Sequence, residues 1–242
     1  DAATGAELWS DDRYDSNHDP FPMNGWLFAD DGYYLYAYSD GTPWPSEGGV
    51  ANENAGYWKL DEAGWTGAAG EVMDASTNAN HGQSYNGPTT TWDAKRGKAG
   101  YFDGVNDYVE IPNSATLQVA GDMTLSFWFK PENLGTARIN PLDKSYGGEF
   151  GLTIETNRSM NYYHGTARVG GKYWSWAAFT NGTLKNGEWQ HVVITRKAST
   201  REMKSYLNGK LMRTTTYSSD TNMVPAASTY PVRIAQGYTG AR

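Results

Sequence analysis

The sequence has no cysteine among its 242 residues, so it can form no disulfide, no thiolate metal site and no cysteine nucleophile. It also lacks any apolar run near the ~18 residues that a membrane-spanning helix needs, so we expect no membrane insertion of this segment. The first residues, DAATGAELWSDD, contain neither an initiator methionine nor a signal peptide, and we interpret the chain as a processed product or a fragment. Windows with helical spacing of apolar residues are missing as well, which argues against a helical fold.

Positive charge is also scarce. Lys and Arg number 20 against 27 Asp and Glu, which gives a formal charge of −7. Nucleic-acid binders usually carry a basic patch or stripe, so we predict no nucleic-acid partner. A hydrophobic content of 38% with 19% charged residues also excludes a disordered chain. The lack of disulfides is typical of a bacterial surface protein or of a cytosolic one, and by itself leaves both open.

Aromatic residues and glycine are abundant instead: 10 Trp, 17 Tyr, 7 Phe and 28 Gly. Apolar residues alternate with polar ones in several short runs, as in Met123, Leu125, Phe127 and Phe129, which fall on one face of an extended segment. Asn208-Gly209, between two such runs, is a strong signal for a type I′ hairpin. These features predict an all-β protein built as a two-sheet antiparallel β-sandwich.

The N-terminal part differs in composition from the rest. After a polar, irregular start, the runs GWLFA and YYLYAYS predict a hairpin, and the Pro- and Gly-rich stretch 42–49 predicts a linker or a long loop. We therefore divide the chain into an irregular, β-rich N-terminal segment, residues 1–50, and a sandwich domain, residues 51–242. The N-terminal segment either packs on the sandwich or forms a unit of its own.

Several motifs occur in a fixed order along the second region. Residues 57–65 read YWKLDEAGW, residues 72–87 read VMDASTNANHGQSYNG and residues 97–112 read GKAGYFDGVNDYVEIP. MTLSFWFKP, NGEWQHVVITRK, SYLNGKLM and YPVRIAQ follow. In this order they resemble the bacterial laminin-G-like, concanavalin A-like lectin/glucanase family of jelly-roll domains, over residues 51–240. The resemblance implies a jelly-roll sandwich.

The chain departs from this family pattern at its C-terminus. Members carry a further strand after the segment that YPVRIAQ resembles, whereas this sequence stops at Arg242. Loss of a strand exposes unpaired backbone groups. We therefore expect either residues 25–38 or a neighbouring chain to fill the gap.

Oxygen-bearing side chains alternate in the loop DASTNAN. Asp74, Asn78 and Asn80 from this loop, with Asp103 and Asp107 from the next hairpin, could supply the six to eight oxygen ligands that Ca²⁺ takes. Members of the resembled family often hold a structural calcium near this loop, so the resemblance also implies Ca²⁺ as a structural cofactor. The alternative is that these residues only close turns through Asx hydrogen bonds.

Dense aromatic segments are the main indication of a ligand site. On the segment KYWSWAAF, Tyr173 falls on one face and Trp174 and Trp176 fall on the other, so one of the two faces presents rings to solvent. Tyr163 lies in a second aromatic run, and Tyr146 lies in a glycine-rich loop with little cover. We predict that these five residues contact a glycan by stacking on sugar rings. The alternative is that the indoles fill the core.

No catalytic motif is found. The E-x-D-x-x-E string of related glucanases is missing, as are the G-x-S-x-G and phosphate-loop motifs. We predict a non-catalytic carbohydrate-binding or adhesion module of a bacterial cell-surface or pilus-associated protein. It would be extracellular and bind a glycan or a surface polysaccharide. One alternative is an assembly module that contacts neighbouring subunits of a surface fibre; a weaker one is a glycoside hydrolase.

Overall fold

A computed structural model describes residues 54–93, 97–144, 148–165, 173–221 and 223–236, together with the backbone of three strands within residues 21–39. The described residues contain no α-helix, and their one helical element is a short 3₁₀ turn, η1 (Ala115–Leu117). In this part of the chain, no helix has the length and apolarity to cross a membrane. The prediction of an all-β fold is confirmed.

The larger sheet has seven antiparallel strands. From one edge to the other they are β12 (Trp174–Phe179), β11 (Met160–His164), β10 (Gly151–Ile154), β9 (Leu142–Asp143), β16 (Val232–Ile234), β7 (Tyr108–Ile111) and β4 (Gln83–Tyr85). Strands from opposite ends of the sequence are therefore neighbours: β16 pairs with β7 on one side and β9 on the other.

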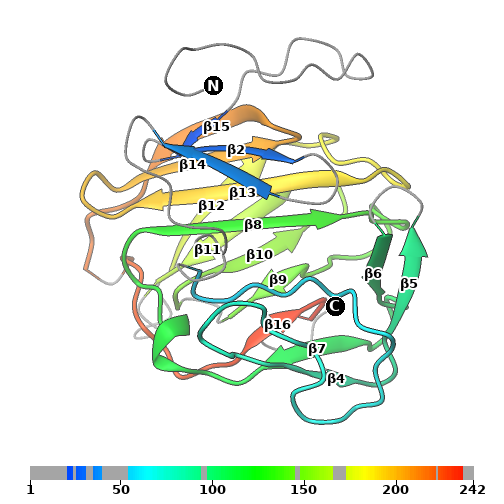
Figure 1. Cartoon of the computed structure of the whole chain (residues 1–242). Coiled ribbons are helices and arrows are strands. Elements are labelled where there is room, and N and C mark those ends of the chain that lie inside the picture. The colour runs from blue at the N-terminus through cyan, green and yellow to red at the C-terminus, as the bar shows by residue number, and fades with distance from the viewer. Residues whose placement is uncertain are drawn as a thin grey trace, which may run out of the picture.

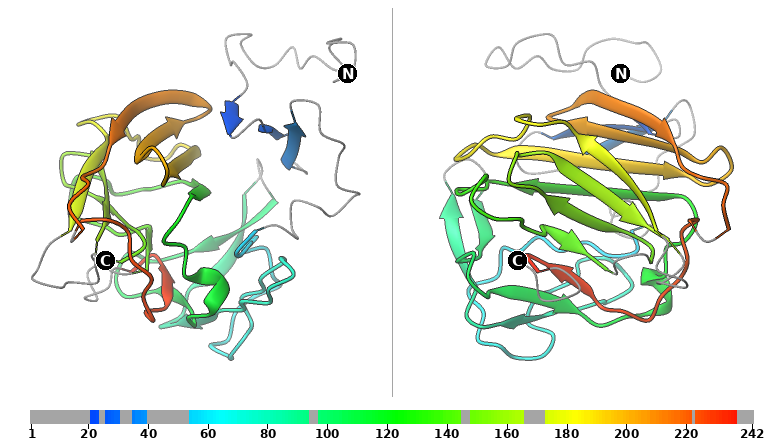
Figure 2. Two further views of the ribbon diagram at one scale, coloured as in Figure 1. Left: turned by 90° about the vertical axis from the view of Figure 1, so that its left-hand side faces the viewer. Right: turned by 180° about the vertical axis from the view of Figure 1, so that it is seen from behind.

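The smaller sheet has four antiparallel strands and packs against the larger one. Its order is β15 (Lys210–Thr216), β14 (Glu202–Leu207), β13 (Gln190–Lys197) and β8 (Met123–Phe129). Figure 1 shows β8 and β13 in front of β9, β10 and β11, and Figure 2 shows the same two layers from the side and from behind. This is the two-sheet sandwich expected from the alternating runs.

Two small sheets complete the described strands. One pairs β5 (Thr89–Asp93) with β6 (Gly97–Tyr101). The other joins β1 (Phe21–Met23), β2 (Trp26–Asp30) and β3 (Leu35–Ser39). The hairpin expected within residues 25–38 exists, but β2 pairs with β3 and β1, and among the described strands none of the three pairs with the sandwich. The expectation that this region adds a strand to the sandwich is therefore wrong, and a strand from a neighbouring chain stays a prediction.

The core lies between the two main sheets and follows from the period-2 alternation of the strands. In the larger sheet, Leu152, Ile154 and Tyr162 point inward, and in the smaller sheet Val192 and Ile194 meet them; all five belong to one buried cluster. The hairpin between β14 and β15 turns at Asn208 and Gly209, whose φ angles of 47° and 87° are both positive. A type I′ turn requires this, so the hairpin predicted there is confirmed.

One irregularity changes which residues of β12 face inward. The pairing of β11 with β12 shifts register between Met160 and Asn161. Because an extra residue on one strand reverses the alternation beyond it, Phe179 points into the core although it follows Ala177 by two positions. Simple alternation from Ala177 would point Phe179 outward, and the bulge accounts for its inward position.

We expect Leu152→Ala to cost about 2–5 kcal/mol of unfolding free energy, because the side chain is fully buried and leaves a cavity between the sheets. Leu211→Ala is the matched control, since Leu211 is 47% exposed on the edge strand β15. Its effect should stay within about 0.5 kcal/mol. Urea unfolding measures both variants. Equal losses would show that the core is not where the two sheets meet.

Candidate binding face

The outer face of the larger sheet carries a continuous cross-strand row. The row has one residue from each strand of the sheet, and each residue is the direct register partner of the next. In the order β4, β7, β16, β9, β10, β11 and β12, the residues are Gln83, Glu110, Arg233, Asp143, Gly151, Tyr163 and Ser175. Their chain neighbours Val109, Val232 and Leu152 belong to the core, so the row points away from it. Figure 2, right, shows the sheet from this side. We call this surface the outer row.

One end of the outer row is an aromatic and charged cluster. The rings of Tyr163 and Tyr173 lie 5.7 Å apart, and the Arg138 guanidinium lies 5.8 Å from the centre of the Tyr163 ring. Arg138 Nε also lies 3.2 Å from Glu155 Oε1, which accepts hydrogen bonds from Thr153 Oγ1 and Asn161 Nδ2 as well. Tyr163 is 8% exposed and Tyr173 is half-buried. The two predicted tyrosines therefore lie together, beside an arginine–carboxylate pair.

The other end has a similar composition. Tyr85 and Tyr108 stack with ring centres 4.8 Å apart and planes only 9° from parallel, and the Arg233 guanidinium lies 5.9 Å from the Tyr108 ring. Arg233 donates from Nε to Glu110 Oε2 at 3.0 Å, and its Nη2 lies 2.9 Å from the same oxygen. Each end of the outer row thus combines two tyrosines with one arginine–carboxylate pair.

A cavity of about 310 Å³ lies between these ends, lined by Asp143, Lys144, Tyr230, Pro231 and Arg233. Strands are spaced about 4.8 Å apart in a sheet. Four spacings separate β7 from β11, so the two ends lie roughly 19 Å apart. Asp143 and Gly151 in the middle of the row are buried, so an extended ligand would contact the cavity and the two end clusters rather than every strand of the row.

The two predicted tryptophans do not belong to this face. Trp176 is 8% exposed and sits in the core cluster, and the partly buried Trp174 packs against the same cluster. Trp174 also stacks on the buried His164 ring at 5.0 Å. The expectation that β12 offers these indoles to solvent is wrong, because its inward face is the one that carries Trp174 and Trp176. Tyr146, the remaining predicted contact, lies outside the described residues.

Most residues of this binding face were not predicted from the sequence. Glu110, Tyr108, Arg138, Asp143 and Arg233 were not singled out, because they come from segments far apart along the chain. One signal was available: in YVEIP and YPVRIAQ, a charged residue alternates with apolar ones, and opposite charges on two strands would be matched if those strands paired.

The predicted calcium ligands form two separate groups. Asp74 Oδ1 accepts from the backbone N–H groups of Tyr57 and Ser76, and Oδ2 accepts from Ser76 Oγ and the N–H of Asn80. A carboxylate has about four lone-pair sites, so these donors occupy all of them. Asn78 and Asn80 use their side-chain amides to hold the carbonyls of Asn54 and Ala55.

The second group lies at the far end of β7. Asp103 Oδ1 accepts from the N–H groups of Val105 and Asn106, and Asp107 Oδ2 accepts from the N–H of Asp103. Asn80 donates a hydrogen bond to Thr116, which follows the end of β7, whereas Asp107 directly precedes the start of β7. As they lie, the five residues do not fit one calcium ion, and within the described residues no three acidic or histidine side chains cluster for a metal. Calcium binding stays a prediction, while the turn-closing alternative accounts for each contact.

We expect Asp74→Asn to lower stability by about 1–3 kcal/mol, because an amide cannot accept at both of its heavy atoms. Burial works against the charged form of Asp74, but the donated hydrogen bonds outweigh it and keep its pKa below the usual value. The resulting stability is present above about pH 3.9, the unfolded-state pKa, and is lost as the pH falls through the folded pKa. The variant should therefore show a shallower acid transition.

Thermal unfolding of EDTA-treated protein, with and without calcium, tests whether these residues form a calcium site. Asp61→Asn is the control, since Asp61 makes an exposed pair with Lys59. The same Tm with and without calcium in the wild type would favour the turn-closing role of these residues. A clear rise with calcium that Asp74→Asn abolishes would instead establish the metal site.

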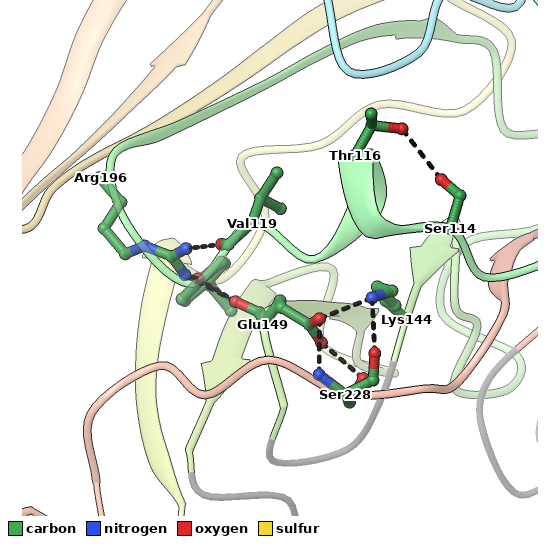
Figure 3. A network of polar contacts seen from close by, with 8 residues as sticks. Ser114, Thr116, Val119, Lys144, Glu149, Arg196 and Ser228 are labelled. Atoms are coloured by element: carbon green, nitrogen blue, oxygen red, sulfur yellow. Dashed lines mark hydrogen bonds and ion pairs between the residues drawn. The ribbon is translucent and has the colours of Figure 1, made fainter. Parts of the chain in front are cut away.

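A buried polar network includes the cavity residue Lys144, and Figure 3 shows its contacts. Lys144 Nζ lies 2.5 Å from Glu149 Oε1, and both side chains are fully buried. Ser228 donates to Glu149 from its N–H at 2.8 Å and from Oγ at 2.6 Å, while its carbonyl accepts from Lys144 Nζ. Ser228 lies two residues before the cavity residue Tyr230, so this network fixes one cavity wall against the other.

Arg196 of β13 extends the network into the second sheet. Its Nη1 donates to the Glu149 carbonyl at 2.6 Å and to the Tyr162 hydroxyl at 2.8 Å, and its other nitrogens donate to the carbonyls of Gly121 and Val119. Burial and, to a lesser degree, the Arg196 charge lower the pKa of nearby His164 to about 3. That histidine therefore remains neutral and adds no cation to those of Lys144 and Arg196.

Lys144→Met should cost about 3–5 kcal/mol of stability, because it leaves the Glu149 carboxylate buried without its cation. Lys59→Met is the control, since Lys59 forms an exposed pair and such pairs contribute about 0–1 kcal/mol. The double variant Lys144→Met, Glu149→Leu should recover much of the loss. Chemical unfolding measures the three proteins. A Lys144→Met loss no greater than the control's would contradict the role given to this pair.

Comparison with known proteins agrees with this architecture. A family profile described as the concanavalin A-like lectin/glucanases superfamily matches residues 103–242, more than half of the chain. The chain therefore belongs to this superfamily, as its motifs led us to expect. A search of curated proteins finds no match.

Among solved structures, the botulinum neurotoxin serotype D binding domain aligns with a TM-score of 0.53 at 13% identity, over 71% of this chain. The receptor-binding domain of the mosaic serotype C/D neurotoxin gives 0.51 at 14% identity, over 74% of this chain. Domain 4 of AbnA, an extracellular arabinanase from Geobacillus stearothermophilus solved with arabinotriose, gives 0.49 at 16% identity, covering 67% of this chain and 76% of that one. The chain spans 42% of each toxin structure, and at these identities the likeness concerns the fold.

Proposed function

We propose that this chain is a non-catalytic carbohydrate-binding module that holds a glycan along the outer row. The observation that carries the proposal is the arrangement of that row: tyrosines and an arginine–carboxylate pair at each end, with a cavity between them. Membership of a superfamily that includes lectins is consistent with it. We further propose that the module works outside the cell, on a bacterial surface.

Binding would combine two kinds of contact. The exposed parts of Tyr173 and Tyr108 offer flat apolar surface to the C–H faces of sugar rings. Arginine N–H groups and carboxylate oxygens beside them orient the hydroxyls. The carboxylates nearest the rings are both engaged by arginines, which suits a role in holding a ligand rather than in transferring protons.

A protein-binding assembly module remains the second proposal, because the strands β12 and β4 are the edges of the larger sheet. An edge strand presents backbone groups on which another chain can pair. The two proposals differ in what they require. A glycan needs the side chains of the outer row, whereas strand addition needs only the backbone of an edge.

We expect Tyr173→Ala to weaken glycan binding about tenfold, equal to ~1.4 kcal/mol, because it removes the most accessible ring of its cluster. Tyr101→Ala is the matched control, since Tyr101 is 48% exposed but lies on β6, away from the outer row. A glycan array identifies a ligand for the full chain, and isothermal titration then compares the variants. Similar losses in both variants, or no glycan bound at all, would contradict the proposal.

A further inference from the structure

We infer that the outer row selects neutral, hydroxyl-rich glycans over acidic ones, and that Glu110 and Glu155 determine this selectivity. The inference rests on the proposed glycan-binding function and adds the chemical class of the ligand. It depends on how the two exposed arginines of the face are partnered.

Each of the two arginines, one in the outer row and one beside it, is paired with a carboxylate from another part of the chain. Arg233 on β16 is paired with Glu110 on β7, its direct partner in the strand register. Arg138 is paired with Glu155, which follows β10. Side chains of both pairs are between 24% and 41% exposed, so a ligand can reach them. Arg233 lies against the Tyr108 ring, and Arg138 lies against Tyr163, whose neighbour Tyr173 is the more exposed ring, so one sugar can contact a ring and a charged pair together.

A paired arginine is poorly suited to an acidic sugar. Carboxylates and sulfates are bound best when a guanidinium offers two parallel N–H groups to the ligand. In Arg233, Nε and Nη2 are already directed at Glu110, and in Arg138, Nε is directed at Glu155. An incoming anion would have to displace a carboxylate that the fold holds in place.

A neutral sugar fits the same groups well. Each hydroxyl of a sugar can donate one hydrogen bond and accept others. An arginine–carboxylate pair offers donors and acceptors side by side, so adjacent hydroxyls can accept from the guanidinium and donate to the carboxylate. Hydrogen bonds to charged partners are also about twice as strong as those between neutral groups.

The surrounding charge acts in the same direction. Among the described residues, the Asp, Glu, Lys and Arg side chains of the outer row, its flanking pairs and the cavity are three cations, Arg138, Lys144 and Arg233, and three carboxylates, Glu110, Asp143 and Glu155. Lys144 is fully buried and paired, so it offers no free charge to a ligand. The whole chain has a formal charge of −7. The face therefore offers an acidic glycan no excess of positive charge, and the overall charge of the chain repels it.

The test uses the full chain on an array of matched glycans, each neutral oligosaccharide beside its sialylated, uronic-acid or sulfated counterpart. We expect the wild type to bind neutral members at least about tenfold more tightly than their acidic counterparts. Affinity for the neutral glycan should change little as salt rises, because it involves no net charge. The double variant Glu110→Gln, Glu155→Gln should lose about tenfold in neutral binding and gain acidic binding that salt weakens.

Asp122→Asn serves as the control, because Asp122 pairs with Lys197 on the smaller sheet, away from the outer row. It should leave both preferences unchanged, and thermal unfolding of every variant verifies that it is folded. A wild type that prefers acidic glycans would overturn this inference while leaving glycan binding established. So would a double variant with unchanged selectivity. Failure to bind any glycan would instead overturn the proposed function itself.

Discussion

The buried pair of Lys144 and Glu149 is the contact on which the binding face depends. Taking both charges out of water is costly, and the fold offsets this cost only by surrounding Glu149 with further donors from Ser228. Satisfying those charges brings together the end of β9 and the segment that leads into β16. The cavity walls come from these two segments, so its shape follows from an electrostatic requirement of the core.

Arg196 extends this network of buried charges and hydrogen bonds across both sheets. Its guanidinium donates to the Glu149 carbonyl and to Tyr162 in the larger sheet, and to two carbonyls in the segment preceding β8. Such a network fixes relative position better than apolar contact does, because hydrogen bonds are directional. The face is therefore held from inside, and its outer residues are left to interact with a ligand rather than to maintain the fold.

Much of the fold could be predicted from local pattern alone. The alternation from Met123 to Phe129 matches β8 residue for residue, and the Asn208-Gly209 turn joins β14 to β15 as expected. These features succeed because they depend on neighbours in the sequence. Alternation cannot say which of the two faces is buried, and this is why Trp174 and Trp176 were assigned to the wrong side. The register shift beside Asn161 is likewise set by packing rather than by local pattern.

The binding face was harder to predict because it exists only after the sheet has formed. Tyr163 and Tyr173 were found from the sequence because they lie close together in it. Glu110 and Arg233 lie on β7 and β16, which meet only through strand pairing across the whole domain. That pairing also determines their chemistry: apart, they would be an acidic and a basic site, whereas together they form a nearly neutral group rich in donors and acceptors. The ligand that the face can recognise thus depends on the order of the strands in the sheet as well as on the residues themselves.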